Sequence, residues 1–157
     1  YFKDTKFSHC LALDVIEHLK TPEDGLDQLF EVTEKHGHLL LSTGNIAFLP
    51  IRAMLLLGAF NYGRKGILDL THKRLFTLKS FKRLVTYHGF KVIKIKGFGI
   101  PLTDLAPNLP CSGLLERLNY FLATLWPSLF AYQLLIICQR PLCHDELMKQ
   151  TFSKEES

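Results

Sequence analysis

The heptapeptide LDVIEHL at residues 13–19 gathers three side chains able to bind a ligand or to exchange a proton, namely Asp14, Glu17 and His18. They directly follow the apolar run FSHCLAL at residues 7–13, which is typical of a buried strand in a parallel sheet. In open α/β sheets, ligands bind in the crevice beyond the carboxyl ends of the strands. The sequence therefore predicts a site bordered by these three side chains.

The segments that follow predict a strand–helix–strand unit. Thr21 and Pro22 suit the N-cap and the first position of a helix, which we expect to end at Gly37. The run HLLLS at residues 38–42 is typical of a second buried strand. Because short connections join the three elements, we expect an α/β fold in which the two strands are parallel.

The second half of the chain predicts two more strands and two helices. Thr77 begins a helix that Gly89 ends, and residues 91–97 then alternate as a half-exposed strand does. Apolar residues at helical spacing over 114–126 predict another helix, and residues 131–139 a final strand.

Length and composition indicate one globular domain. The chain has 157 residues, of which 47% are hydrophobic and 22% charged, which excludes disordered and low-complexity classes. We expect a domain over residues 1–142 and a polar tail over 143–157. The net charge of +4 implies no particular partner. Four cysteines without CxxC spacing favour reduced thiols in a cytoplasmic protein, and the start at Tyr1 suggests part of a longer chain.

Two apolar stretches raise the question of contact with a membrane. Residues 46–60 carry Arg52 as their one charge and are too short to cross a bilayer. They predict a core helix, a lid over an apolar pocket, or a peripheral membrane contact. Residues 118–138 lack charge, but Pro127 interrupts them, so we expect no transmembrane span.

Basic residues dominate the stretch from residue 64 to residue 96, which contains ten Lys and Arg residues and a single acidic residue, Asp69. Such a stretch is either a solvated surface or one that attracts phosphate, from RNA, phospholipid or a phosphorylated substrate. Because exposed aromatic residues are not interleaved with it, a nucleic-acid partner is the less favoured alternative.

The order of several motifs resembles a known family. The motifs are DVIEHL, GHLLLSTGN, THKRLFT and a helix ending in HGF. In this order they resemble the class I S-adenosylmethionine-dependent methyltransferases over residues 7–97, and most closely the subgroup around the ubiquinone-biosynthesis O-methyltransferases. The resemblance implies the C-terminal part of a Rossmann-like, mostly parallel sheet of about four strands, with an antiparallel closing strand and flanking helices.

The resemblance also implies that three strands and a glycine-rich cofactor turn lie before Tyr1. No GxGxG motif is present, so we expect this part to be inactive alone. Ser8, Lys35-His36 and Gly44 depart from the family pattern.

The resemblance gives the candidate residues their roles. Leu13 and Asp14 would contact S-adenosylmethionine. His18 and His72 would be general bases, because imidazole titrates near neutral pH. Alternatively, Asp14, Glu17, His18 and His72 would bind a divalent metal such as Mg or Mn. A third alternative is structural: Glu17 orients the following helix and His18 packs at the strand ends.

These observations favour methyl transfer from S-adenosylmethionine to a small, lipophilic acceptor. An RNA methyltransferase is the second hypothesis, motivated by the basic stretch. The third is a non-catalytic, truncated methyltransferase-like module.

Overall fold

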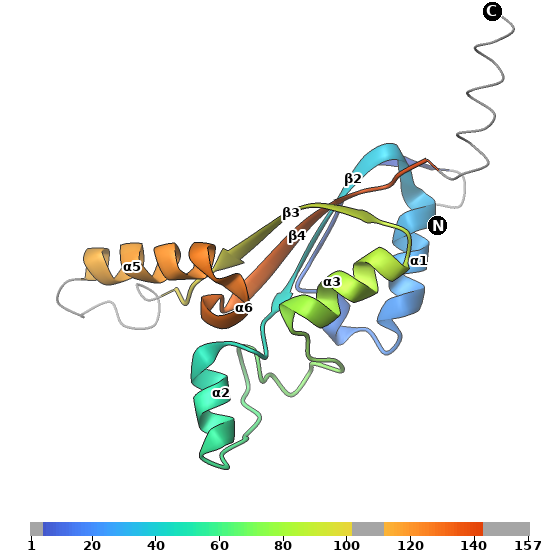
Figure 1. Cartoon of the computed structure of the whole chain (residues 1–157). Helices are drawn as coiled ribbons and strands as arrows, with labels where there is room; N and C mark the ends of the chain where they lie inside the picture. The colour runs from blue at the N-terminus through green and yellow to red at the C-terminus, as the bar shows by residue number, and fades with distance from the viewer. Residues whose placement is uncertain (1–4, 102–111, 143–157) are drawn as a thin grey trace, which may run out of the picture.

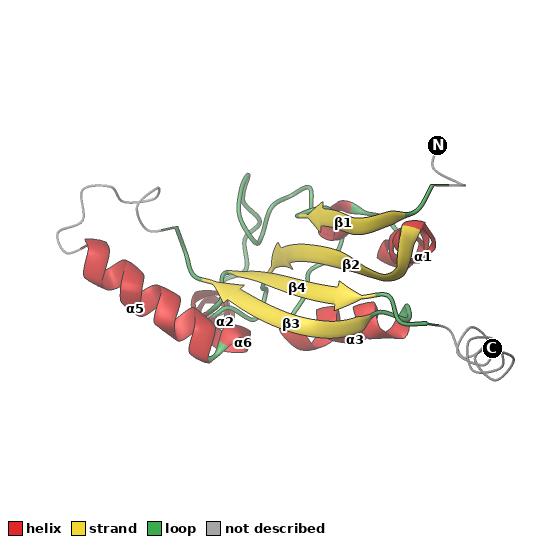
Figure 2. Ribbon diagram, turned by 90° about the horizontal axis from the view of Figure 1, so that it is seen from above, coloured by secondary structure: helices red, strands yellow, loops and turns green. Residues whose placement is uncertain are grey.

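A mixed four-stranded sheet forms the centre of the computed structural model, which describes residues 5–101 and 112–142 (Figure 1). The strands are β1 (Phe7–Leu13), β2 (Thr33–Gly44), β3 (Lys91–Phe98) and β4 (Gln133–Gln139). Their spatial order is β1-β2-β4-β3, and they lie side by side in Figure 2. β1 and β2 are parallel, whereas β4 is antiparallel to both of its neighbours.

This topology confirms the predicted α/β fold with one antiparallel strand. The predicted strand over residues 7–13 has the bounds of β1, and the one over 91–97 matches β3 to within a residue. The final strand begins at Gln133 rather than at residue 131. The antiparallel strand lies inside the sheet, between β2 and β3, because β4 pairs with both of them.

Two helices cover one face of this sheet, α1 (Pro22–Val32) and α3 (Leu78–Tyr87). Leu26 of α1 and Phe81 of α3 belong to a single hydrophobic core with side chains from all four strands. Thr77 and Ser80 form a reciprocal capping box at the start of α3, as its predicted beginning requires. Gly89 follows α3 with φ +85°, a conformation that favours glycine.

Helix α1 ends earlier than predicted, at Val32 instead of Gly37, and β2 begins at Thr33. The predicted N-cap residue, Thr21, occupies that position without a side-chain hydrogen bond. The end of α1 is held by long-range contacts: the guanidinium of Arg140 donates to the carbonyls of Phe30 and Thr33, at 2.9 and 2.7 Å. Arg140 is 107 residues from Thr33, so local spacing could not have predicted this end.

Strand β1 buries only one of its faces in the described part of the chain. Cys10 and Ala12 are buried in the core, whereas His9, Leu11 and Leu13 are exposed. The strand predicted to be buried over residues 7–13 is therefore buried on one face only within residues 5–101 and 112–142. The physical reason is that α1 and α3 both pack on the Cys10 side, and within those ranges β1 pairs with β2 alone.

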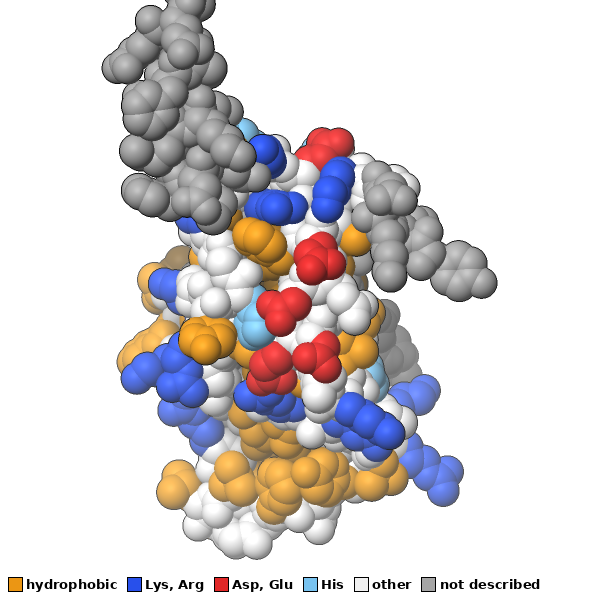
Figure 3. Space-filling view, turned by 90° about the vertical axis from the view of Figure 1, so that its right-hand side faces the viewer, with side chains coloured by type: hydrophobic (Ala, Val, Ile, Leu, Met, Phe, Trp, Pro, Cys, Tyr) orange, Lys and Arg blue, Asp and Glu red, His pale blue; other side chains and the backbone are white. Residues whose placement is uncertain are grey.

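The apolar stretch over residues 46–60 contains α2 (Leu49–Leu56), in which only Ile51 is buried. This exposure contradicts its interpretation as a core helix within the described residues. Figure 3 shows hydrophobic side chains gathered at the end of the molecule where α2 lies in Figure 1. The low-charge stretch 118–138 is divided as expected: α5 (Ser112–Leu125) ends before Pro127, which opens the short α6 (Pro127–Phe130).

Neither of these stretches forms a membrane-crossing helix. In residues 5–101 and 112–142, no helix combines the length and the apolar character needed to span a bilayer.

We expect residues 1–157, produced alone, to self-associate, because β1 presents a free edge and an exposed apolar face in the described structure. Leu11 is 63% exposed on that face, so Leu11→Lys should lower the association constant at least several-fold. Sedimentation velocity over a concentration series measures the effect. Gln28→Lys, which adds the same charge on exposed α1, is the control. A chain that stays monomeric without any substitution would contradict the expectation.

Candidate functional site

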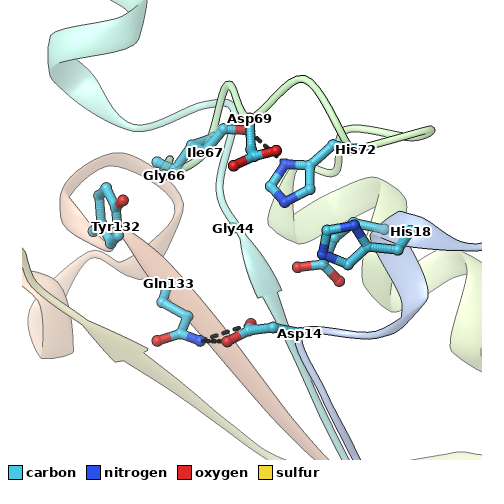
Figure 4. Close-up of a pocket in the computed structure, with 10 residues that line it drawn as sticks. Asp14, His18, Gly44, Gly66, Ile67, Asp69, His72, Tyr132 and Gln133 are labelled. Carbon is cyan, nitrogen blue, oxygen red and sulfur yellow. Dashed lines mark hydrogen bonds between the residues drawn. The ribbon is translucent and has the colours of Figure 1, made fainter. Parts of the chain in front are cut away.

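A pocket of about 260 Å³ lies at the carboxyl ends of β1 and β2, where the sequence predicts a site (Figure 4). Its lining includes all four residues predicted to bind a metal, namely Asp14, Glu17, His18 and His72. The remaining lining residues are Gly44, Gly66, Ile67, Asp69, Tyr132 and Gln133. Four separate segments of the chain therefore converge on one opening.

Asp14 turns the chain out of β1 at the rim of this pocket. Its φ of +52° is in the left-handed region, which few non-glycine residues adopt. The hydroxyl of Ser42 donates to Asp14 Oδ1 at 2.9 Å and accepts from the Asp14 backbone N–H at 3.0 Å. The Gln133 amide donates to both carboxylate oxygens, at 2.7 and 2.8 Å, as Figure 4 shows. These contacts fix the carboxylate and stabilise its strained backbone.

Glu17 lies in η1 (Ile16–His18), a single 3₁₀ turn that follows Asp14, and it is only 3% exposed. Its backbone carbonyl accepts hydrogen bonds from the N–H groups of Lys73 and Arg74, at 2.7 and 3.1 Å. These bonds tie η1 to the loop that carries His72. Among the described residues, Glu17 Oε2 has no hydrogen-bond partner, and burial raises the pKa of this carboxyl above its ordinary value.

His18 and His72 lie edge to face, with ring centroids 4.7 Å apart. His72 Nδ1 is 2.9 Å from the carbonyl oxygen of Ile67, which can only accept, so Nδ1 carries the proton. His18 Nδ1 lies 3.3 Å from the Thr71 carbonyl oxygen and 3.2 Å from the Thr71 hydroxyl. Both contacts favour a proton on Nδ1, so Nε2 is the nitrogen of each ring that can bind a ligand.

Asp69 accepts hydrogen bonds from Thr71, the residue that contacts His18. Its Oδ1 accepts from the Thr71 hydroxyl at 2.6 Å and from the Thr71 N–H at 2.7 Å. The bond to the Thr71 hydroxyl lowers the pKa of Asp69, the strongest of several influences that keep it ionised. Because the Thr71 proton points at Asp69, the hydroxyl oxygen is oriented to accept from His18 Nδ1.

One ligand atom from each of Glu17, His18 and His72 lies within 4.8 Å of the other two. This is the one group of three or more such donors found in residues 5–101 and 112–142. Asp14, the fourth residue predicted to bind metal, is outside the group and is engaged by Ser42 and Gln133. Leu13 is half exposed at the end of β1 and is not among the residues that line the pocket.

Sequence reasoning missed several lining or supporting residues, among them Asp69, Thr71, Tyr132 and Gln133. Asp69 had a signal, since it is the single acid of the basic stretch. No sequence signal pointed to Gln133, because its contact with Asp14 spans 119 residues and requires β4 to pair beside β2.

Comparison with known proteins finds a family model. Residues 2–95 match the family described as a methyltransferase domain. A search of curated proteins finds no match.

Several solved structures have a similar fold. A SAM-dependent methyltransferase of Archaeoglobus fulgidus matches with a TM-score of 0.53 and 20% identity, covering 88% of this chain and 61% of that one. A SAM-dependent methyltransferase of Thermotoga maritima gives 0.57 and 16%, with coverage of 88% and 58%. The small RNA methyltransferase HEN1 gives 0.52 and 19%, with coverage of 88% and 14%.

These identities establish similarity of fold alone. The chain spans about three fifths of the length of the first two structures.

We expect Glu17→Gln to raise the free energy of unfolding at pH 7 by about 1 kcal/mol, since it removes a buried charge whose Oε2 has no hydrogen-bond partner in the described residues. The folded-state pKa of Glu17 is raised, so stability falls as the pH rises from the unfolded value of 4.5 through the folded value. The gain should therefore shrink toward pH 4, where Glu17 is protonated in both states. Urea titrations with a chelator present measure it.

Glu23→Gln is the matched control, because a hydrogen bond from Arg74 lowers the pKa of Glu23. This half-exposed pair is stabilising above pH 4.5 and weakens as the pH falls, so the control should have the opposite pH trend. Equal stability of Glu17→Gln and the unsubstituted chain at every pH would contradict the expectation.

Proposed function

This chain belongs to the methyltransferase-domain family, and on that premise we propose that it forms one side of the active site of an S-adenosylmethionine-dependent methyltransferase. The observation that carries the proposal is the pocket at the carboxyl ends of β1 and β2, where Asp14 and the Glu17–His18–His72 group converge. Residues 1–142 would form the C-terminal part of the domain, since the chain spans about three fifths of the similar structures and contains no GxGxG motif.

Leu13 and Asp14 are proposed to lie on the donor side. Asp14 suits this role because Ser42 and Gln133 hold its carboxylate in one orientation at the pocket rim. A fixed negative charge complements the ammonium group of the methionine portion of the donor. A glycine-rich segment outside this sequence would supply the opposite wall.

Methyl transfer to a hydroxyl breaks the bond between the methyl carbon and the sulfonium sulfur and forms a bond to the acceptor oxygen. S-Adenosylhomocysteine leaves, and the hydroxyl proton passes to a base or to water. The protein accelerates this step chiefly by holding donor and acceptor close and in line. It must also help the hydroxyl to lose its proton, either with a base or with a cation.

We favour the cation, held by Glu17, His18 and His72. The donor set fits: the three ligand atoms lie within 4.8 Å of one another, and Glu17 Oε2 is a buried acceptor without a partner in the described residues. The Nδ1 contacts of both imidazoles leave Nε2 for coordination, which is the usual support for histidine ligands. A carboxylate with two imidazoles suits Mn more than Mg. When bound, the cation would lower the pKa of the acceptor hydroxyl.

A small, lipophilic acceptor fits the surroundings better than RNA does. Ile67 and Tyr132 line the pocket, and both pack in a hydrophobic cluster with Phe48 and Ile51 at the base of α2. The pocket is therefore bounded on one side by apolar surface. The similarity to HEN1 concerns the fold and supports no particular acceptor.

The first test is donor binding, measured by calorimetry on the full-length protein that contains this chain. We expect a dissociation constant in the micromolar range, and a rise of about tenfold or more for Asp14→Ala, equivalent to roughly 1.4 kcal/mol. Asp24→Asn, which removes an exposed carboxylate on α1, is the control and should bind normally. Absence of binding heat would overturn the proposed function.

The second test concerns the cation. At a concentration of 100 times its dissociation constant, Mn²⁺ should stabilise the protein by about 2.7 kcal/mol, a rise in melting temperature of roughly 5 °C. Glu17→Gln and His72→Ala should lose this rise, whereas His9→Ala, on the exposed face of β1, should keep it. Full activity after chelation, with no thermal shift on adding Mn²⁺ or Mg²⁺, would reject the cation and leave a histidine as the base.

A further inference from the structure

The apolar tip of the molecule, which we define as residues 49–62, has the composition of a buried element but is exposed. A helix that is apolar on nearly every side is normally buried in a protein core or a membrane. In α2, however, only Ile51 is buried. Leu56 and Leu57 are 88% and 86% exposed. The other large exposed side chains of the tip are Leu49, Met54, Leu55, Phe60 and Tyr62.

The tip is also bordered by positive charge. From residue 35 to residue 68 the sequence contains no Asp or Glu, whereas Arg52, Arg64 and Lys65 lie within or just after the tip and are exposed. Figure 3 shows basic side chains beside the apolar cluster at this end of the molecule. Phe60 and Tyr62 pack edge to face between the apolar helix and the basic pair, with ring centroids 5.3 Å apart.

We propose that the apolar tip docks on the surface of an anionic lipid bilayer, with Leu56 and Leu57 inserted and Arg64 and Lys65 at the phosphate level. The sequence of apolar residues, an aromatic pair and basic residues matches the layers of a bilayer interface. Each basic side chain near an anionic surface adds to the electrostatic attraction. The inference goes beyond the proposed function and does not depend on it.

The same charges argue against a second copy as the occupant. Packing two apolar tips about a two-fold axis would bring the basic residues of both copies to the rim of one interface, where like charges repel. An anionic bilayer instead neutralises them. The surface also lies beside the pocket, since Gly66 and Ile67, which follow Arg64 and Lys65 directly, are part of its lining.

The test is sedimentation of the full-length protein with vesicles of phosphatidylcholine alone or with 30% phosphatidylglycerol, across a salt series. We expect at least tenfold tighter binding to the anionic vesicles, weakening as salt increases. Leu56→Glu/Leu57→Glu should reduce binding at least tenfold, and Arg64→Glu/Lys65→Glu should abolish the preference for anionic vesicles. Leu56 and Leu57 are almost fully exposed, so these changes should leave the melting temperature unaltered.

Matched controls lie on α3, on another side of the molecule. Tyr87→Glu removes an aromatic residue that is 85% exposed, and Lys82→Glu reverses an exposed charge; both should bind vesicles normally. Equal binding to neutral and anionic vesicles, no binding, or binding unaffected by Leu56→Glu/Leu57→Glu would each overturn the proposal. So would a dimer that these substitutions dissociate in the absence of lipid. Donor binding, measured separately, reports on the proposed function alone.

Discussion

The parallel pairing of β1 with β2 is the constraint on which the candidate site depends. Its register sets Leu13 opposite Ser42, so both strands reach the same edge of the sheet together. The chain then leaves β1 through Asp14, whose left-handed backbone is held by the Ser42 side chain. Because η1 follows at once, the positions of Glu17 and His18 are set by this exit. A shift of one residue in the pairing would reverse which side chains face the core and would separate Asp14 from Ser42.

The antiparallel strand β4 contributes Gln133 to the pocket. The beginning of an antiparallel strand lies at the edge where its parallel neighbours end, so Gln133 meets Asp14 there. Asn45, fully buried after β2, donates to the Ala131 carbonyl at 2.9 Å and holds the entry to β4. The pocket is therefore formed by residues far apart in the chain, and its integrity depends on the whole sheet.

The sequence could predict those helices and strands whose ends are set by residues close to them in the chain. The apolar run before Asp14 and the capping residues of α3 gave strand and helix in the right places, and thus placed Asp14, Glu17 and His18 at one edge. His72 was expected there only from the family resemblance. The contacts of Gln133 and Arg140 were out of reach, since each joins segments more than 100 residues apart. For α2, composition alone cannot distinguish a buried helix from an exposed one.

The pocket contains two features that cost stability, although neighbouring helix termini are well satisfied. The end of α1 and the start of α3 are capped, by Arg140 and by the Thr77–Ser80 box. At the carboxyl ends, the same fold tolerates a strained Asp14 backbone and a buried Glu17 oxygen that has no partner in the described residues. Folding gains nothing from either feature, since both cost stability. His36 also has a left-handed backbone, and His88 Nε2 is also buried without a partner in the described residues, but only the pocket combines both features. Such a combination is typical of a functional site. These features thus point to the pocket independently of any relative.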